Sequence, residues 1–406
     1  MKGISNNDMK FSWRHEWGYY KSFPGTATDE QASGAYIFRP DIPDADFESL
    51  SPIKTTVVES SLLTEVHVEY EVPWIKEVIV MQQDKEFIDF KYTVGPIDIS
   101  DGVGKEIVSR FETTIKNRGR FYTDSNGREF IERKRSSRNT WKLEEFEPIS
   151  GNYYPVNAAI YIEDEDTSLS LLTDRTQGGS SLNDGVIEVM VHRRTVSDDR
   201  RGVGEPINET DAGIMPYPPY GDASRKGDGI VITGMHRVFI GSGKCGASLS
   251  RDQMEEMFSP LQVFAATSLP KMSSLSSLQK SSISALLKPL PKNLQLTTMK
   301  LLHVRNGINT FLIRLSHLYG KEESISLSEP ASVDLSEVLI NFDIINISET
   351  TLSGNRDREE WFQNKMDWSS IRNSREVLKY EMGGNLTIVV QPMEIRTFRV
   401  EAKRIM

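Results

Sequence analysis

The chain has 406 residues, 38% of them hydrophobic, which is more than one average domain contains and enough to fill one or two sizeable cores. Its 48 basic and 58 acidic residues give a net charge of −10, which repels phosphate backbones and anionic membranes and excludes nucleic acid as a favoured partner. The single cysteine, Cys245, cannot form an internal disulfide, so packing and strand pairing must stabilise the fold.

Residues 1–31 are aromatic and polar without a periodic pattern, and we expect an irregular lead segment there. This stretch lacks the apolar core of a signal peptide, and about 18 consecutive apolar residues occur nowhere in the chain. We therefore expect no membrane partner, and the compartment of the chain itself stays open.

Short strands follow one another from residue 32 onward. Apolar or β-branched residues recur over residues 36–38, 55–70, 72–81 and 87–92, which predicts a β meander. Asn126-Gly127 gives the strongest hairpin signal, because a tight primed turn needs positive φ at both central residues.

The centre of the chain combines strands with polar residues. Residues 158–162, 169–172 and 186–191 are predicted strands, and residues 177–181 a glycine-rich turn. The third of these strands ends in His192, Arg193 and Arg194, which places a polar cluster at the mouth of a sheet. Asp198-Asp199 lies nearby, but neighbouring strand residues point to opposite faces, so we expect a solvated turn rather than a catalytic pair.

The remaining segments complete a two-domain β protein. Residues 230–233 and 236–240 are predicted strands, residues 254–266 a helix, and the Ser/Pro/Lys-rich residues 267–293 a linker. Residues 299–315, 333–346 and 386–400 alternate like strands of a small sandwich. We therefore expect a large β-sandwich domain over 32–266 and a smaller C-terminal β-sandwich domain over 294–406.

Several ungapped blocks carry a family resemblance. NYYPVN, LTDRTQGGSSLNDG, MVHRR and DDRRGVGEP, with SGAYIFRP and GRFYTDSNGRE upstream and PMEIRTF downstream, resemble the C-terminal half of class II α-mannosidases of glycoside hydrolase family 38, of the lysosomal or vacuolar acid type. The resemblance covers nearly the whole chain. It implies an all-β fold, with a large mutarotase-like β supersandwich followed by a smaller C-terminal sandwich, and a vacuolar, lysosomal or extracellular parent.

The resemblance also implies which residues border a sugar. Tyr36 of the SGAY block and an arginine of the MVHRR strand, Arg193 or Arg194, would line the mannose pocket, while His192 is a weaker candidate. A phenol can bond to a sugar hydroxyl, and a guanidinium can hold a carboxylate in its ionised form. Strand register decides which arginine faces the pocket, because the two point to opposite sides.

Catalytic groups are not expected in this chain. In the family, a zinc ion held by two His and two Asp sits beside a nucleophilic Asp in an N-terminal α/β domain. Zinc ligands usually come in short-spaced pairs, and the six histidines here do not. We therefore expect no metal, no cofactor and no catalytic residue in this chain, and an N-terminal α-mannosidase domain is the expected partner.

Two further patterns have ordinary explanations. The GSGKCG stretch at residues 241–246 matches GxGxxG but follows a β meander, so we expect a turn rather than a dinucleotide site. Three sequons, at Asn208, Asn346 and Asn385, are glycosylation candidates, although chance supplies about as many in a chain of this length.

Three hypotheses for function follow. The chain is the C-terminal β region of an α-mannosidase, acting on mannose-containing oligosaccharides and inactive without the zinc-bearing domain. Alternatively, it is a stand-alone carbohydrate-binding or assembly module without catalysis, or a truncated product with no role of its own. An in-frame α/β coding region with a His-x-Asp motif immediately upstream would favour the α-mannosidase region or the truncated product over the stand-alone module.

Overall fold

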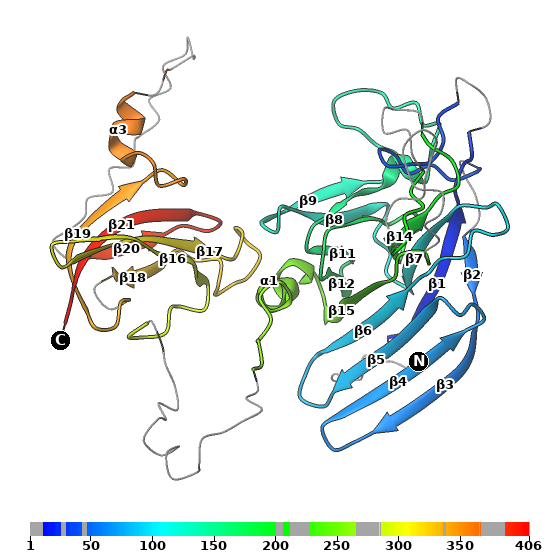
Figure 1. Cartoon of the computed structure of the whole chain (residues 1–406), viewed down its shortest axis with the longest axis horizontal. Coiled ribbons are helices and arrows are strands. Elements are labelled where there is room, and N and C mark those ends of the chain that lie inside the picture. The colour runs from blue at the N-terminus through cyan, green and yellow to red at the C-terminus, as the bar shows by residue number, and fades with distance from the viewer. Residues whose placement is uncertain are drawn as a thin grey trace. The chain divides into compact units, whose positions relative to one another are not determined.

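The structure is a computed structural model that describes residues 11–25, 30–42, 47–199, 206–211, 228–264, 284, 286–335, 338–364, 366 and 386–405. The chain divides into two compact units, Met1–Pro260 and Leu261–Met406, each of which is built mainly of antiparallel strands (Figure 1). No helix in the described ranges is long and apolar enough to cross a membrane. The all-β prediction is confirmed.

The first sheet of unit 1 has six strands in the order β10-β13-β14-β7-β1-β2. Its strands are β1 (Trp13–Lys21), β2 (Glu48–Leu50), β7 (Lys105–Thr113), β10 (Tyr154–Val156), β13 (Gln177–Ser180) and β14 (Val186–Arg194). A single-turn 3-10 helix, η1 (Ser150–Asn152), leads into β10. All of these strand pairs are antiparallel.

The second sheet of unit 1 has nine strands in the order β3-β4-β5-β6-β15-β12-β11-β8-β9. Its strands are β3 (Pro52–Glu59), β4 (Leu63–Tyr70), β5 (Ile75–Gln82), β6 (Phe87–Val94), β8 (Arg120–Ser125), β9 (Glu129–Lys134), β11 (Ala159–Glu163), β12 (Thr167–Thr173) and β15 (Ile232–Ser242). Figure 1 shows β3 to β6 as a continuous meander, as the alternation predicted. Asn126 and Gly127 both have positive φ between β8 and β9, which confirms the hairpin.

One apolar core joins the two sheets of unit 1. Trp17 and Phe111 from the first sheet and Phe90 and Ile160 from the second belong to the same buried cluster. Each large side chain of this kind contributes about 1.5–3 kcal/mol when fully buried. Unit 1 is therefore a β sandwich with a shared interior, as predicted for the large domain.

Unit 2 has a sheet of four strands in the order β16-β17-β21-β19 and a pair, β18-β20. Its elements are β16 (Leu294–Arg305), β17 (Ile308–His317), β18 (Ala331–Asp334), β19 (Phe342–Thr350), α3 (Arg358–Gln363), β20 (Thr387–Val390) and β21 (Ile395–Arg404). Leu315, Val390 and Phe398 are buried in its own core, which both sheets share. The small C-terminal sandwich is therefore present. Most of the predicted linker, residues 267–293, lies outside the described residues.

The predicted lead segment is wrong in its structured part. Strand β1 lies between β7 and β2, and Trp17 at its centre is fully buried. The large domain therefore begins well before residue 32. Buried residues fall on both faces of this strand, so the sequence has no period-2 pattern to reveal it.

Four local predictions are also corrected. Residues 36–38 form no strand, and residues 177–180 form strand β13 instead of a turn. The predicted strands 230–233 and 236–240 are one strand, β15 (Ile232–Ser242), because the predicted break at residues 234–235 continues the pairing with β6. Helix α1 spans Gly246–Phe258, ahead of the predicted 254–266. Pro260 disfavours helical backbone at residue 259 and so ends the helix there.

Candidate functional site

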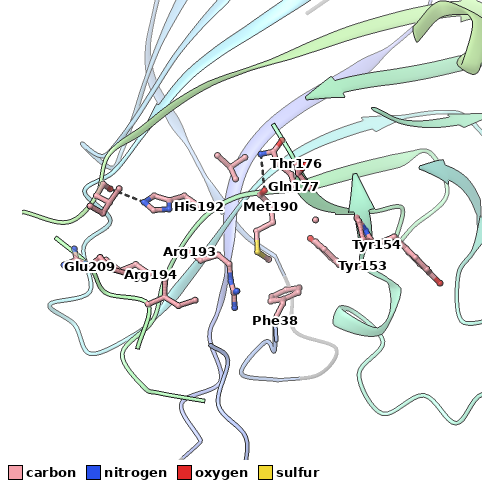
Figure 2. A pocket seen from close by; sticks show the side chains of 15 residues that line it. Phe38, Tyr153, Tyr154, Thr176, Gln177, Met190, His192, Arg193, Arg194 and Glu209 are labelled. Carbon is pink, nitrogen blue, oxygen red and sulfur yellow. Dashed lines mark hydrogen bonds between the residues drawn. The ribbon is translucent and has the colours of Figure 1, made fainter. Parts of the chain in front are cut away.

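A cavity of about 850 Å³ opens beside β10, β13 and β14 in unit 1 (Figure 2). Phe38 and Tyr153 lie on one side of it, with ring centroids 4.9 Å apart and an edge-to-face geometry. His192, Arg193 and Arg194 also line the cavity. Three of the four candidate residues from the sequence are therefore brought together.

A bulge in β14 sets the direction of the three basic residues. The pairing of β14 with β7 shifts register between Met190 and His192, after which Arg193 lies directly opposite Glu106. A bulge of this kind re-aims the side chains that follow it. The glycines of β13 allow close packing beside this strand, because a Cβ on Gly179 would lie 2.8 Å from Val156 and 3.1 Å from Val189.

Arg193 is used inside the protein. Its Nε donates to Oε2 of Glu106, which is fully buried, and its Nη2 donates to the Ile37 carbonyl at 2.9 Å. A second bond from Nη2 reaches the Ser33 hydroxyl at 3.2 Å. The charge of this guanidinium is therefore already balanced by Glu106, and Arg193 fixes the chain around residue 37.

Arg194 and His192 have fewer partners. Arg194 Nη1 donates to the Ile97 carbonyl at 2.6 Å, whereas its Nε is buried and has no hydrogen-bond partner within the described ranges. His192 Nε2 donates to the Ile230 carbonyl at 3.1 Å. Burial lowers the pKa of His192, and the nearby Arg194 charge adds to this effect. Of the two arginines, Arg194 is therefore the better candidate for contacting a molecule bound in the cavity.

Tyr36 lies apart from the cavity wall. Its side chain is 62% exposed and is not among the lining residues. Its backbone N–H donates to Oδ2 of Asp199 at 3.1 Å. Asp199 is almost fully buried, so the expectation of a solvated turn is wrong for this residue. Arg200 and Arg201 lie outside the described residues.

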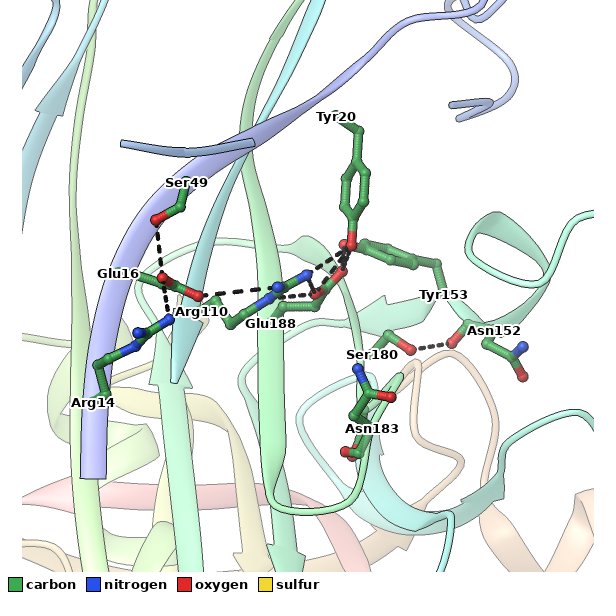
Figure 3. Close-up of polar contacts among 11 residues, drawn as sticks. Arg14, Glu16, Tyr20, Ser49, Arg110, Asn152, Tyr153, Ser180, Asn183 and Glu188 are labelled. Carbon is green, nitrogen blue, oxygen red and sulfur yellow. Dashed lines mark hydrogen bonds and ion pairs between the residues drawn. The ribbon is translucent and has the colours of Figure 1, made fainter. Parts of the chain in front are cut away.

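Tyr153 on the cavity wall is fixed by a buried carboxylate. Its hydroxyl donates to Glu188, which also accepts from Tyr20 at 3.1 Å and from Arg110 Nη2 at 2.7 Å (Figure 3). Burial, followed by the charge of Glu188, raises the pKa of Tyr153 well above its usual value. The phenol therefore stays protonated and presents its ring, not its hydroxyl, to the cavity.

A neutral histidine supports the cavity from behind. His236 is fully buried, and its Nε2 donates to Oε1 of Gln177, a lining residue, at 2.9 Å. Gln177 Nε2 in turn donates to the Met190 carbonyl at 3.1 Å. Burial lowers the pKa of His236 to about 3, so this side chain is uncharged across the ordinary pH range.

The other motifs have structural roles. A Glu163 oxygen accepts the Gly246 N–H at 3.2 Å, so a carboxylate of the chain itself already occupies the start of α1 after the GxGxxG stretch. Asn208 is half-buried and Asn346 lies exposed on β19, while Asn385 is outside the described residues. Their glycosylation stays a prediction.

The described residues offer no metal site. Within the ranges that the structure covers, no group of three or more His, Cys, Asp or Glu side chains lies close enough to hold an ion. The zinc that the resemblance implies belongs to the N-terminal domain of the family, and the expectation of no metal in this chain stays a prediction.

Sequence reasoning missed the structural roles of three buried carboxylates, of which only Asp199 was considered, as part of a solvated turn. Glu106, Glu188 and Asp199 are all buried and all fix a residue of the site. A signal existed for Glu188, which stands in the apolar stretch VIEVMV, because a charged residue in a buried strand needs a partner.

Comparison with known proteins identifies the family. Residues 5–201 match the glycosyl hydrolases family 38 C-terminal domain, and residues 293–398 match the family 38 C-terminal beta sandwich domain. The chain therefore belongs to glycosyl hydrolase family 38, of which it carries the C-terminal domains.

Relatives of known name place the chain within the family. It is similar to lysosomal alpha-mannosidase of Bos taurus, with 39% identity over 95% of this chain and 36% of that protein. It is also similar to an alpha-mannosidase of Arabidopsis thaliana, with 38% identity over 95% of this chain and 36% of that protein. The chain thus spans little more than a third of the length of these relatives.

A solved structure agrees with the fold. The alpha-mannosidase of Enterococcus faecalis matches with a TM-score of 0.55 and 13% identity over 96% of this chain and 38% of that chain. At this identity the likeness concerns the fold alone.

Proposed function

We propose that this chain is the C-terminal β region of an α-mannosidase and acts in the hydrolysis of terminal α-mannose residues of oligosaccharides. It contributes one wall of the sugar site and works together with the zinc-bearing N-terminal region of the family. The observation that carries this proposal is the match of 95% of the chain to only 36% of a lysosomal alpha-mannosidase.

The cavity supports a sugar-binding role. Phe38, Tyr153 and Tyr154 give it aromatic walls, and Arg194 adds a cation with a buried Nε that has no partner among the described residues. Aromatic faces combined with a few convergent polar groups are typical of small-molecule sites. A pyranose ring, which has apolar faces and polar edges, matches this arrangement.

In this proposal, the two carboxyl groups that cleave the glycosidic bond do not come from this chain. Hydrolysis with retention requires a nucleophilic carboxylate and a carboxylic acid about 5–5.5 Å apart. Glu106, Glu188 and Asp199 are buried and bonded within the fold, so none of them is placed to attack a sugar. We therefore assign the reacting carboxylates and the metal to the N-terminal region.

Turnover by the purified chain alone tests this assignment. With an aryl α-mannoside at acidic pH, we expect no release of the aglycone, whether or not zinc is added. Zinc-dependent release by this chain alone would contradict the proposal.

The cavity also permits a test of the stand-alone alternative. Methyl α-mannoside can be titrated into the purified chain, with an Arg194→Met variant as the control. A partial sugar wall should bind only weakly, with a Kd above about 1 mM, which corresponds to roughly −4 kcal/mol. Micromolar binding that Arg194→Met abolishes would favour a carbohydrate-binding module instead. For the compartment, we infer a lysosomal or vacuolar location from the similarity to lysosomal alpha-mannosidases.

A further inference from the structure

The turn at residues 33–37 is anchored by several hydrogen bonds, although Tyr36 within it is exposed. The Gly34 N–H donates to the Ile37 carbonyl at 3.0 Å, which closes the turn. Asp199 packs closely against Gly34, because a Cβ on Gly34 would lie 2.6 Å from the Asp199 Cβ. The Tyr36 N–H then donates to the same Asp199 carboxylate at 3.1 Å.

A buried ion pair anchors the other side of this turn. Glu106 accepts from the Ser33 hydroxyl at 2.5 Å and from the Ser22 hydroxyl at 2.9 Å, and it pairs with Arg193. Arg193 Nη2 donates to the Ile37 carbonyl at 2.9 Å. Glu106 and Ser33 are both fully buried, so these bonds form where water does not compete for them.

The side chain at the tip of this turn has no such role in packing. Tyr36 is 62% exposed, while the backbone on either side of it is bonded to Asp199 and Arg193. A fixed backbone that presents an exposed aromatic side chain lowers the ordering cost of binding.

We propose that Glu106, Arg193 and Asp199 are positioning residues that hold Tyr36, two residues before the cavity-lining Phe38, in place for a sugar that reaches beyond the cavity wall. This inference rests on the proposed function, and it changes the role that the sequence suggested for Arg193. Its guanidinium acts through the turn, because its bonds go to Glu106, Ser33 and Ile37.

A second buried pair in the same unit provides a matched control. Arg237 bonds Asp89 through Nε at 2.7 Å and Nη2 at 3.0 Å, and Asp89 is nearly fully buried. Among the described residues, Arg237 contacts Asp89, Gln253 and Glu256 and makes no bond to residues 33–37. Glu106→Gln and Asp89→Asn each neutralise a buried carboxylate, so both should destabilise unit 1, but only the first should release the turn.

Amide hydrogen exchange on the chain itself tests the support of the turn without any activity. In Glu106→Gln, peptides that cover residues 31–40 should exchange at least about tenfold faster, because local opening no longer breaks the anchoring bonds. In Asp89→Asn the same peptides should exchange as in the wild type. Equal exchange in the two variants would overturn the proposal.

Turnover tests whether the support acts through Tyr36. The chain is co-expressed with the N-terminal half of a related α-mannosidase, and kcat/KM is measured for Glu106→Gln, Tyr36→Ala and the double variant. Glu106→Gln should lower kcat/KM by up to about 100-fold, the loss expected from a displacement of about 1 Å. In the Tyr36→Ala background it should have no further effect, whereas Asp89→Asn should act independently of Tyr36.

The results separate this inference from the proposed function. If the wild-type pair of halves shows no turnover, the proposed function fails, and the exchange experiment still decides whether Glu106 supports the turn. If the pair is active and Glu106→Gln lowers kcat/KM equally with and without the Tyr36 side chain, the positioning role is wrong.

Discussion

Buried carboxylates in unit 1 are each matched by several donors. Glu188 receives hydrogen bonds from Tyr20, Tyr153 and Arg110, and Glu77 receives them from Trp17 and Tyr70. Burying an ionised carboxylate is costly unless it is paired and bonded in this way. These residues therefore fix the positions of their neighbours, and their removal leaves unpaired groups behind.

Glu188→Gln tests this dependence at a single residue. The substitution removes the negative charge that faces the poorly exposed Arg110, so the free energy of unfolding should fall by about 3–5 kcal/mol, the cost of leaving a buried charge without its partner. The matched control is Glu132→Gln, whose ion pair with Arg120 is solvent-exposed and should contribute less than about 1 kcal/mol. Urea unfolding of the three proteins measures both values, and equal losses would contradict the argument.

His236 should make unit 1 sensitive to acid. Its pKa is lowered to about 3 in the folded chain from an unfolded value of 6.5, so the unfolded chain takes up the proton first. The stabilisation is complete above pH 6.5 and is lost as the pH falls towards 3, at about 1.4 kcal/mol per pH unit.

The pH dependence of unfolding measures this effect. The free energy of unfolding of the wild type should fall by about 2–3 kcal/mol more than that of His236→Gln between pH 6.5 and 4.5. His67→Gln, at an exposed position, serves as the control and should follow the wild type. Parallel curves for wild type and His236→Gln would show that this histidine is not the group responsible.

Single elements show what a sequence pattern can and cannot predict. The meander β3 to β6 and the hairpin β8–β9 follow alternation and turn chemistry, which are local properties. Strand β1 has aromatic residues on both faces, and β13 contains two glycines, so neither sequence shows the alternation of a strand. Both segments are extended because they pair with neighbouring strands. The candidate site was also predicted only in part, because some of it follows from local sequence and the rest from contacts between distant residues. The strand ending in His192 was visible, whereas the partners of Arg193 depend on a bulge and on distant residues.

The hairpin turn gives a clean test at the level of an element. A Cβ on Gly127 would meet nothing within 4 Å, so Gly127→Ala acts only through its φ of +70°. A left-handed conformation costs an L-residue about 1–2 kcal/mol. Gly151→Ala also adds a Cβ in open space but at a position without positive φ, and it should be close to neutral. Equal unfolding free energies for the two variants would contradict the turn geometry.

Strand β1 can be tested as part of the large domain. Trp17 is fully buried at its centre, so Trp17→Ala should lower the unfolding free energy by about 3–5 kcal/mol. Trp141 is 61% exposed, and Trp141→Ala should change it by less than about 0.5 kcal/mol. A small effect at Trp17 would restore the idea of an irregular lead segment.

At the scale of the whole molecule, each unit is a β sandwich, and unit 1 carries the aromatic-walled cavity and the turn at residues 33–37. The described residues contain no cluster of metal-binding side chains. The chain matches little more than a third of its α-mannosidase relatives, and fold alone does not supply an activity. The activity therefore has to be tested with the rest of the family's architecture present.

Complementation measures the central claim most directly. The N-terminal half of a related α-mannosidase is expressed with and without this chain, and zinc-dependent hydrolysis of an aryl α-mannoside is followed at acidic pH. The account predicts turnover only when both are present, with a strong loss for Arg194→Met. Turnover that does not depend on this chain, or its absence when both halves are folded and associated, would contradict the account.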